Sequence, residues 1–405
     1  MNPFRIVLYE IRQGFNGSKW LPLMTAYAVL SGIIGPGFHY PLIHIPFIVV
    51  GLLLAFKSKL HIEFASALLL IYLPINILIT GPDAIFNSWV RLALFLSVFV
   101  FVSPLLRGQY LSLYRKKILM AILFICALLG FGSFVCYFLG INYMLSYYDG
   151  SAISGSQLNS GGFGGLMQHS ISLGMVCGLG MLYLLYQSLS QPKKDRMWYY
   201  VAIVVLALTI LLSASRTALL AAIIGMLVML YQSNKTKGKF IQVLIVILFI
   251  GLVTYPFWED FMTGIESKNS TQVELGAYGS RTEKWTARIA EFASSPIVGI
   301  GYASVNQSLD DVGVGGVIEP GSSWLAILSM TGIIGFILVL LILIKPVQYL
   351  RNHPTPYNAL LLGLMVYICS HMISEGYIFA GGSALCFMAW LILGCCNDAR
   401  YTEMK

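Results

Sequence analysis

The sequence consists mainly of long apolar runs separated by short polar or glycine- and proline-rich breaks. A transmembrane helix needs roughly 20 mostly apolar residues, because hydrocarbon offers no partner to an unsatisfied backbone group. The pattern predicts twelve such helices. They are residues 21–36, 40–56, 62–80, 85–105, 118–140, 169–187, 197–213, 216–232, 240–257, 323–344, 357–375 and 377–395. We therefore expect an all-α integral membrane protein in which residues 1–405 form a single polytopic membrane domain.

Composition agrees with this fold class and excludes several functions. Apolar residues make up 58% and charged residues 10%, whereas soluble proteins usually carry about 25% charged residues. Basic loops explain the net charge of +8, and no basic patch interleaved with aromatic residues indicates a nucleic-acid partner. The seven cysteines lack metal-ligand spacing, so we predict free thiols, no metal site and no cofactor. Residues 1–20 lack the apolar core of a removable signal peptide.

Basic residues gather in alternate loops and in both terminal segments. By the positive-inside rule these segments face the cytoplasm. The clusters are Arg5/Arg12/Lys19, Lys57/Lys59, Arg107/Arg115/Lys116/Lys117, Lys193/Lys194/Arg196, Lys235/Lys237/Lys239, Lys345/Arg351 and Arg400/Lys405. The remaining loops then face outward, and two of them are long: residues 141–168, and residues 255–322 between the ninth and tenth spans.

The larger outward loop contains a helical pattern of its own. Trp285, Ile289 and Phe292 recur at helical spacing, and Pro296 follows where such a helix would end. We predict a short amphipathic helix on the outer membrane surface, with Trp285 at the interface. Arg281 would begin this helix, where free N–H groups and the helix dipole favour an anion. A lipid headgroup contact is the alternative role for this arginine.

Arg216 lies in a short hairpin, residues 213–217, between two almost purely apolar runs. Its charge cannot be lost, so it is costly in hydrocarbon unless it meets water, an anion or a carboxylate. The planar guanidinium matches phosphate oxygens well. Two interpretations stay open, namely an anion-binding arginine at the membrane surface and a loop arginine that reaches for water. Arg216 and Arg281 together would suit a diphosphate.

Four outward residues are candidates to accept a proton from an attacking hydroxyl. They are Glu319, His169, His371 and Glu375. Each also has a structural interpretation. Glu319 would be an ordinary loop carboxylate and His169 a helix cap. His371 would be a buried imidazole with its hydrogen bonds satisfied, and Glu375 would mark a short turn. The sequence does not choose among them.

Three further residues complete the candidate set. Arg91 lies inside the fourth span, where an arginine is either functional or paired with a neighbouring helix. Arg288 and Trp285 belong to the predicted surface helix. Aromatic residues of the outer loops suit sugar faces and suit an interfacial belt equally well.

Four segments resemble the O-antigen ligase / O-antigen polymerase superfamily of bacterial envelope enzymes. They read Ser-Ala-Ser-Arg-Thr-Ala at 213–218, Gly-Ser-Arg-Thr-Glu-Lys-Trp at 279–285, Ser-Pro-Ile-Val-Gly-Ile-Gly at 295–301, and a stretch beginning Ser-Ser-Trp at 322–335. A glycine-rich stretch at 164–174 is similar to the one that precedes a span in this family. The motifs are short, and their order and spacing carry the resemblance.

The resemblance implies a multi-spanning (GT-C-like), inverting, metal-independent membrane glycosyltransferase. Its donor would be a glycan on undecaprenyl diphosphate, held by Arg216 and Arg281. It would lie in the bacterial inner membrane with both termini cytoplasmic, and with loops 141–168 and 255–322 and the active site periplasmic. The implied partners are this donor, a glycan acceptor, membrane lipids and a chain-length regulator.

One departure from the family bears on the reaction. Ligases of this family carry a histidine near the end of the large loop, whereas this chain has Glu319 and no histidine there. The difference favours a polymerase of O-antigen, capsule or exopolysaccharide repeat units over a ligase that transfers glycan to lipid A-core in lipopolysaccharide. The alternative of another class is a transporter, or flippase, of lipid-linked oligosaccharide. Many transporters contain repeated halves, and no internal repeat is evident here.

Overall fold

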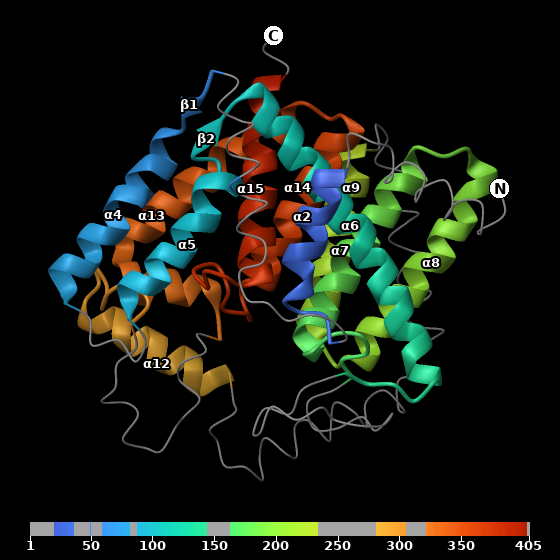
Figure 1. The fold of residues 1–405 in the computed structure, drawn as a ribbon, viewed down its shortest axis with the longest axis horizontal. Coiled ribbons are helices and arrows are strands. Elements are labelled where there is room, and N and C mark those ends of the chain that lie inside the picture. Colours follow the sequence, from blue (N-terminus) through green and yellow to red (C-terminus); the bar gives the residue numbers. More distant parts are fainter. Residues whose placement is uncertain are drawn as a thin grey trace. The chain divides into compact units, whose positions relative to one another are not determined.

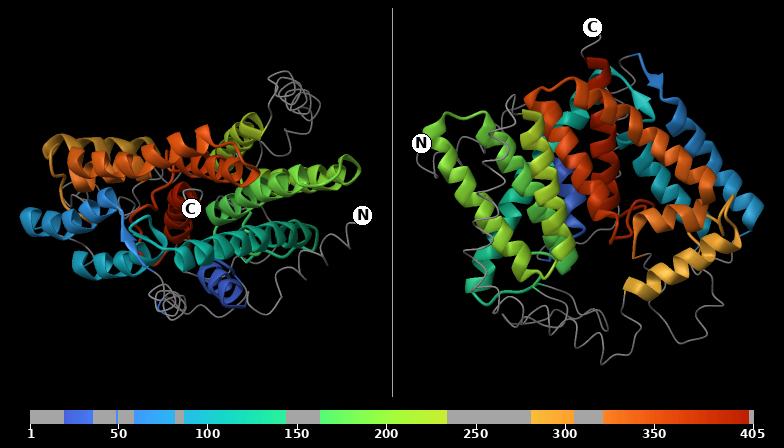
Figure 2. Two further views of the ribbon diagram at one scale, coloured as in Figure 1. Left: turned by 90° about the horizontal axis from the view of Figure 1, so that it is seen from above. Right: turned by 180° about the vertical axis from the view of Figure 1, so that it is seen from behind.

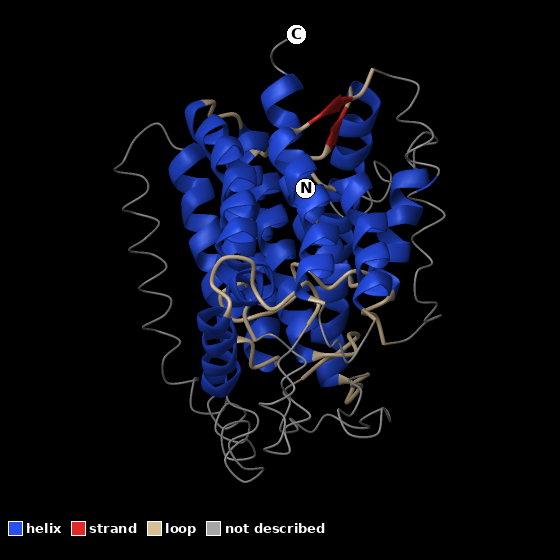
Figure 3. Cartoon of the chain, turned by 90° about the vertical axis from the view of Figure 1, so that its left-hand side faces the viewer, coloured by secondary structure: helices blue, strands red, loops and turns tan. Residues whose placement is uncertain are grey.

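The computed structural model describes residues 20–35, 49, 59–81, 87–143, 163–233, 281–304 and 321–402. This part of the chain is almost entirely helical, with one short strand pair (Figure 1 and Figure 3). The elements are α2 (Trp20–Ser31), β1 (His61–Ile62), α4 (Phe64–Thr80), α5 (Ser88–Val102), β2 (Leu106–Arg107), α6 (Gln109–Phe138), α7 (Ser170–Leu189), α8 (Lys193–Leu212), α9 (Arg216–Ser233), α12 (Arg281–Ser294), α13 (Ser323–Asn352), α14 (Pro356–His371) and α15 (Ala384–Thr402). The strands β1 and β2 pair antiparallel.

The helices follow the predicted apolar runs. Ten of the twelve runs overlap a helix, although α15 begins and ends seven residues later than the predicted span 377–395. The other two, 40–56 and 240–257, lie almost wholly outside the described residues. Within the described chain, five helices are long and apolar enough to cross a bilayer, namely α6, α7, α8, α9 and α13. The prediction of an all-helical, multi-pass membrane protein is confirmed, while the count of twelve spans stays a prediction.

The chain forms two compact units, each assembled from three stretches that are separated in sequence. Unit 1 comprises Met1–Tyr40, Lys117–Thr271 and Leu350–Tyr367. Unit 2 comprises Pro41–Lys116, Gln272–Tyr349 and Ile368–Lys405. That residues 1–405 act as a single domain stays a prediction.

Unit 1 is built around α7, which is buried along nearly all of its length. Glycines let the neighbouring backbones approach it and one another. A Cβ added at Gly180 would lie 3.0 Å from the Cα of Ala127 on α6. Where α9 meets α14, a Cβ added at Gly225 would lie 2.8 Å from the carbonyl oxygen of Gly363. Any larger residue at these positions would push the helices apart, so close packing of this unit depends on them.

Unit 2 has an aromatic core. Phe95 lies within 6.0 Å, between ring centroids, of four other aromatic rings. Those rings belong to Phe99, Tyr302, Phe379 and Trp390. Most of the pairs are tilted or edge-to-face, the arrangements that aromatic quadrupoles favour. The rings come from α5, α15 and two loops, so this core joins segments that lie far apart in the chain.

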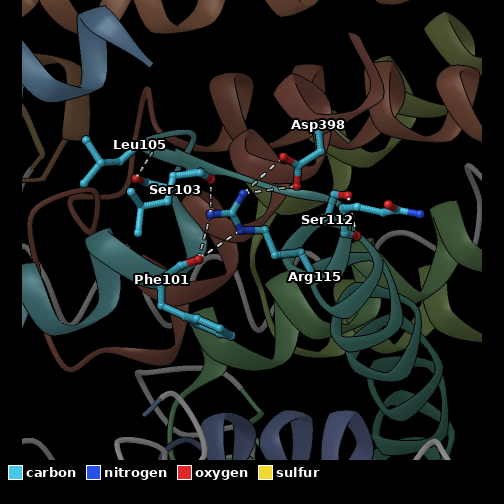
Figure 4. A network of polar contacts seen from close by, with 8 residues as sticks. Phe101, Ser103, Leu105, Ser112, Arg115 and Asp398 are labelled. Carbon is cyan, nitrogen blue, oxygen red and sulfur yellow. Dashed lines mark hydrogen bonds and ion pairs between the residues drawn. The ribbon is translucent and has the colours of Figure 1, made fainter. Parts of the chain in front are cut away.

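At the end of unit 2 that holds β1 and β2, a buried arginine joins three segments (Figure 4). Arg115 of α6 donates to both carboxylate oxygens of Asp398 on α15, at 3.2 and 3.1 Å. It also donates to the carbonyls of Phe101, at 2.9 and 2.8 Å, and of Leu106, at 2.9 Å. The sequence pattern counts Arg115 as one more basic loop residue, whereas the structure shows a fully buried charge whose partners are all internal.

We expect Asp398→Leu to lower the free energy of unfolding by about 3–5 kcal/mol, because the substitution leaves Arg115 buried without its carboxylate. The double variant Arg115→Met/Asp398→Leu should recover more than half of that loss, since no uncompensated charge remains. Reversible unfolding in mixed detergent micelles measures both values. The single variant Arg115→Met completes the comparison. If the stability losses of the two single variants simply add up to the loss in the double variant, this account is contradicted.

Candidate functional site

In unit 1, a tight turn ahead of α7 presents one candidate residue. Its backbone is held from two directions: Leu166 accepts from the N–H of Gly35 at 2.7 Å and donates its own N–H to Ser133 Oγ at 3.1 Å. Gly165 has φ +56°, and a Cβ there would lie 2.5 Å from that of Ser133. His169 follows the turn, exposed, as the N-cap of α7, and its Nδ1 accepts from the N–H of Ile171 at 3.2 Å. The structure therefore shows His169 in the helix-cap role that the sequence left open.

The α8–α9 hairpin presents Arg216 at the first position of α9, exposed. The hairpin is tight, since Ala214 has φ +53° and the N–H of Ser213 returns to the carbonyl of Thr209 at 3.1 Å. Its tip rests on α7: a Cβ added at Gly174 would lie 2.7 Å from the Cβ of Ser215. The N-termini of α7 and α9 therefore open at the same end of unit 1. Two helix dipoles and one guanidinium favour an anion there.

In unit 2, α13 is broken in its N-terminal third, at Gly332, which has φ 62° and ψ −167° (Figure 2). The preceding loop docks into the break. The N–H groups of Ile300 and Gly301 donate to the carbonyls of Ser329 and Met330, at 2.8 and 3.1 Å. In the opposite direction, the N–H groups of Ile333 and Ile334 donate to the carbonyls of Pro296 and Ile297, at 2.9 and 3.4 Å. The docked loop thus replaces the bonds that the helix loses.

Two glycines make this docking possible. A Cβ added at Gly299 would lie 2.5 Å from the backbone of Met330, and one added at Gly332 would lie 2.2 Å from the carbonyl oxygen of Ile297. The predicted span 323–344 therefore contains a break that its apolar pattern did not indicate. The glycine inside the run was the available signal.

A helix, α12, occupies the place where the spacing predicts one, across the ends of α4 and α13 (Figure 1 and Figure 2). Its first residue is Arg281, whose side chain lies outside the described part of the structure. Trp285 donates its indole N–H to the carbonyl of Gly321 at 3.0 Å, so the helix is tied to the start of α13. Ile289 of the predicted apolar stripe is 55% exposed. The stripe therefore does not turn wholly toward the protein.

The buried face of α12 instead carries an ion pair. Arg288 and Glu291 are 1% and 0% exposed, and their Nη1 and Oε2 atoms lie 2.8 Å apart. Burial lowers the pKa of the Arg288 guanidinium, and Glu291 opposes that shift. Arg288, a candidate for substrate binding from the sequence, thus has a partner within its own helix.

His371 and Glu375 surround the start of α13. His371 is fully buried, and its Nδ1 lies 3.2 Å from the Tyr377 hydroxyl. Glu375 is 4% exposed, and its backbone carbonyl accepts from both the N–H and the hydroxyl of Ser323, at 2.9 and 2.7 Å. The Ser323 hydroxyl accepts in turn from the N–H of Tyr377 at 2.9 Å. These contacts join the turn after α14 to the start of α13 through the backbone of Glu375.

Arg91 lies on α5 and is half-buried. It interacts electrostatically with Tyr302, a fully buried residue whose hydroxyl donates to the carbonyl of Phe379 at 3.2 Å. The candidate set is thus divided between the units. Arg216 and His169 share one end of unit 1; Arg91, Arg281, Arg288, Trp285, His371 and Glu375 belong to unit 2; Glu319 lies outside the described residues. No metal-binding group of His, Cys, Asp or Glu occurs among the described residues.

Comparison with known proteins identifies the central segment. The family model described as O-antigen ligase matches residues 201–340. This segment is similar to that family, and the match supports the resemblance of the chain to the O-antigen ligase and polymerase superfamily. The matched stretch of this superfamily contains Arg216, α12 with Arg281, the docked loop and the break in α13. His169, His371, Glu375 and Arg91 lie outside it.

None of the curated proteins compared with the chain matches it significantly. A chain in a solved structure, described as showing structural coordination of polymerization and crosslinking by a peptidoglycan synthase complex, is 14% identical. That match covers 85% of this chain and 99% of the other, with a TM-score of 0.42.

We expect Gly332→Ala to lower the free energy of unfolding by more than about 2 kcal/mol, since alanine is strained at this φ and its Cβ meets Ile297. Gly32→Ala is the matched control, because the nearest atom to its Cβ is the Val29 carbonyl oxygen at 3.7 Å. Unfolding in mixed micelles distinguishes them. Equal stability of the two variants would mean that the loop is not docked in the break.

Proposed function

We propose that the protein is a periplasm-facing glycosyltransferase of the bacterial inner membrane that polymerises undecaprenyl-diphosphate-linked oligosaccharide repeat units. The observation that carries the proposal is the superfamily match at residues 201–340, which includes both arginines of the predicted diphosphate site. The exposed position of Arg216, at the N-terminus of a membrane helix, supports its part in that site. The products would be O-antigen, capsule or exopolysaccharide chains.

The proposed reaction needs no group beyond the two lipid-linked glycans. A terminal hydroxyl of the acceptor repeat unit attacks the anomeric carbon of the donor glycan. A carbon–oxygen bond forms there as the bond to the diphosphate oxygen breaks, and the configuration inverts. Undecaprenyl diphosphate leaves with the bonding electrons, and the hydroxyl proton passes to a basic side chain.

The proposed part of the arginines is electrostatic. Negative charge on the diphosphate grows as it departs, and cations already in place stabilise that charge in the transition state more than in the bound substrate. Arg216 belongs to unit 1 and Arg281 to unit 2. Glu319 is our first candidate for the base, with His169 as the second, because His169 is exposed while its Nδ1 caps α7.

Transfer of finished glycan to lipid A-core is the second candidate function, and the matched family's description as O-antigen ligase favours it. The two reactions differ in what a deletion strain accumulates. A lost polymerase leaves single repeat units on the cell surface, whereas a lost ligase leaves long chains that are not attached to lipid A-core. Loss of a flippase of lipid-linked oligosaccharide would leave the units unpolymerised on the cytoplasmic side.

We expect Arg216→Ala and Arg281→Ala each to reduce chain elongation by about 10²–10³-fold, with lipid-linked single units accumulating, because each removes one cation that stabilises the leaving diphosphate. Arg→Lys at either position should recover only part of the loss, since lysine lacks the planar fork. Turnover of purified lipid-linked repeat unit measures the effect.

Arg351→Ala is the control for loss of one exposed arginine from a helix terminus. It should elongate chains at the parental rate. Normal chain length in both Arg216→Ala and Arg281→Ala would refute the proposal, as would cysteine labelling that places positions 216 and 281 on opposite sides of the membrane.

A further inference from the structure

The helix α4 carries a buried amide that the proposed reaction does not use. Asn76 is fully buried in an otherwise apolar helix. Its Nδ2 donates to the carbonyl of Val298 at 2.6 Å, and its Oδ1 accepts from the N–H of Tyr302 at 2.7 Å. Both ends of the amide therefore bond to the backbone of one loop, more than 220 residues away in sequence.

A second residue of α4, one turn earlier, contacts the same region. The hydroxyl of Tyr72 donates to the carbonyl of Thr331, at 2.7 Å, and lies 3.3 Å from the carbonyl of Val298. Thr331 directly precedes the break in α13 at Gly332, so its carbonyl has lost the usual helical partner. Tyr72 thus bonds to both sides of the contact between loop and broken helix.

In these bonds the side chains of α4 and the backbone of the loop satisfy each other's hydrogen-bonding groups. A buried polar side chain is costly unless it is bonded, and so is a buried backbone group. Each satisfies the other only while the loop is docked. Because unmaking the contact would leave several buried polar groups without partners at once, the docked position is strongly preferred.

The docked loop is the direct continuation of α12. The N–H of Ser295 returns to the carbonyls of Glu291 and Phe292, at 3.3 and 3.2 Å, and the N–H of Gly299 bonds to the carbonyl of Ser295 at 2.8 Å. No free linker therefore separates α12 from the segment that Asn76 holds. Since α12 extends about 20 Å from that anchor, a small displacement of the loop becomes a larger one at Arg281.

The structure assigns Asn76 and Tyr72 as positioning residues that fix α12, and with it Arg281, through the docked loop 295–304. The catalytic consequence rests on the proposed function of Arg281. Both residues lie on α4, outside the segment matched by the family model. The N-terminal part of this chain, which carries no motif of the superfamily, thereby contributes to the geometry of the proposed site.

The test combines a spectroscopic readout of α12 with kinetics in the full-length protein. A spin label is attached at Ala290→Cys, an exposed position of α12, and the spectrum of the labelled parent, with its seven native cysteines, is subtracted. Asn76→Leu removes both bonds at similar volume. Tyr72→Phe removes only the hydroxyl and keeps a folded protein available should Asn76→Leu fail to fold. Leu73→Ala is the control, a fully buried apolar truncation on the same helix.

We expect the label to become more mobile in Asn76→Leu and, to a smaller degree, in Tyr72→Phe, with Leu73→Ala unchanged despite lower thermal stability. For the lipid-linked donor, kcat/KM should fall about 10- to 100-fold in Asn76→Leu and a few-fold in Tyr72→Phe, because misplacement of a binding group costs rate steeply. Leu73→Ala should keep the parental kcat/KM.

An unchanged label spectrum in folded Tyr72→Phe and Asn76→Leu would overturn the assignment, and equal mobility in Leu73→Ala would show a general loosening instead. The two proposals fail separately. If α12 becomes mobile in the α4 variants while Arg281→Ala remains active, the positioning role of Asn76 and Tyr72 is supported and the diphosphate role of Arg281 is refuted. If Arg281→Ala is inactive while α12 stays in place in both α4 variants, only the positioning falls.

Discussion

The structure of unit 2 depends on how backbone hydrogen bonds are satisfied at the break in the N-terminal third of α13. At Gly332 the helical bonding pattern fails, and carbonyls before the break and N–H groups after it need other partners. Ser329, Met330 and Thr331 are buried, so each of their carbonyls left without a partner would be costly. The loop 296–301 supplies donors and acceptors in the right order, and Tyr72 supplies one more. A broken helix is tolerated here because a second segment completes it.

This constraint explains why the large loop is not an independent appendage. The same six residues that complete α13 also end α12, and they are bonded to α4 through Asn76. Further along, Trp285 and Ser323 tie the helix and the loop's end to the start of α13 and to the turn after α14. Under the proposed function the loop binds a charged headgroup and gains from such a frame, since preorganised groups need no rearrangement when the transition state forms.

Arginines in this chain have different roles that look alike in sequence. Arg115 occurs in a basic cluster and Arg288 in an amphipathic helix, yet both are buried and paired with a carboxylate, one on a distant helix and one three residues away. Arg216 occurs between two apolar runs and is exposed at a helix terminus. Hydropathy alone does not separate these cases, because the cost of a buried charge depends on partners that only the folded chain brings near.

The sequence by itself determined the fold class, the places of most described helices and the resemblance to the superfamily. Apolar runs of membrane-spanning length must be helical wherever they meet lipid, and the spacing in α12 is a local property, so both could be predicted from neighbouring residues. The short motifs that resemble the superfamily agree with the family match at 201–340. Glu319, the base candidate in the large loop, lies outside the described residues and stays a prediction.

Only the tertiary structure decided which polar groups meet. The segment 296–301 docks into the break at Gly332, and Asn76 bonds to Val298, which lies 222 residues away in sequence. No local pattern specifies either pairing. The tertiary structure likewise turned Arg288 and Glu291 of α12 toward the protein and left Ile289 exposed, the reverse of what a hydrophobic stripe suggests for a soluble helix. The physical reason is the same in each case: a polar group inside a membrane protein takes its position from its partner, and that partner is set by the fold.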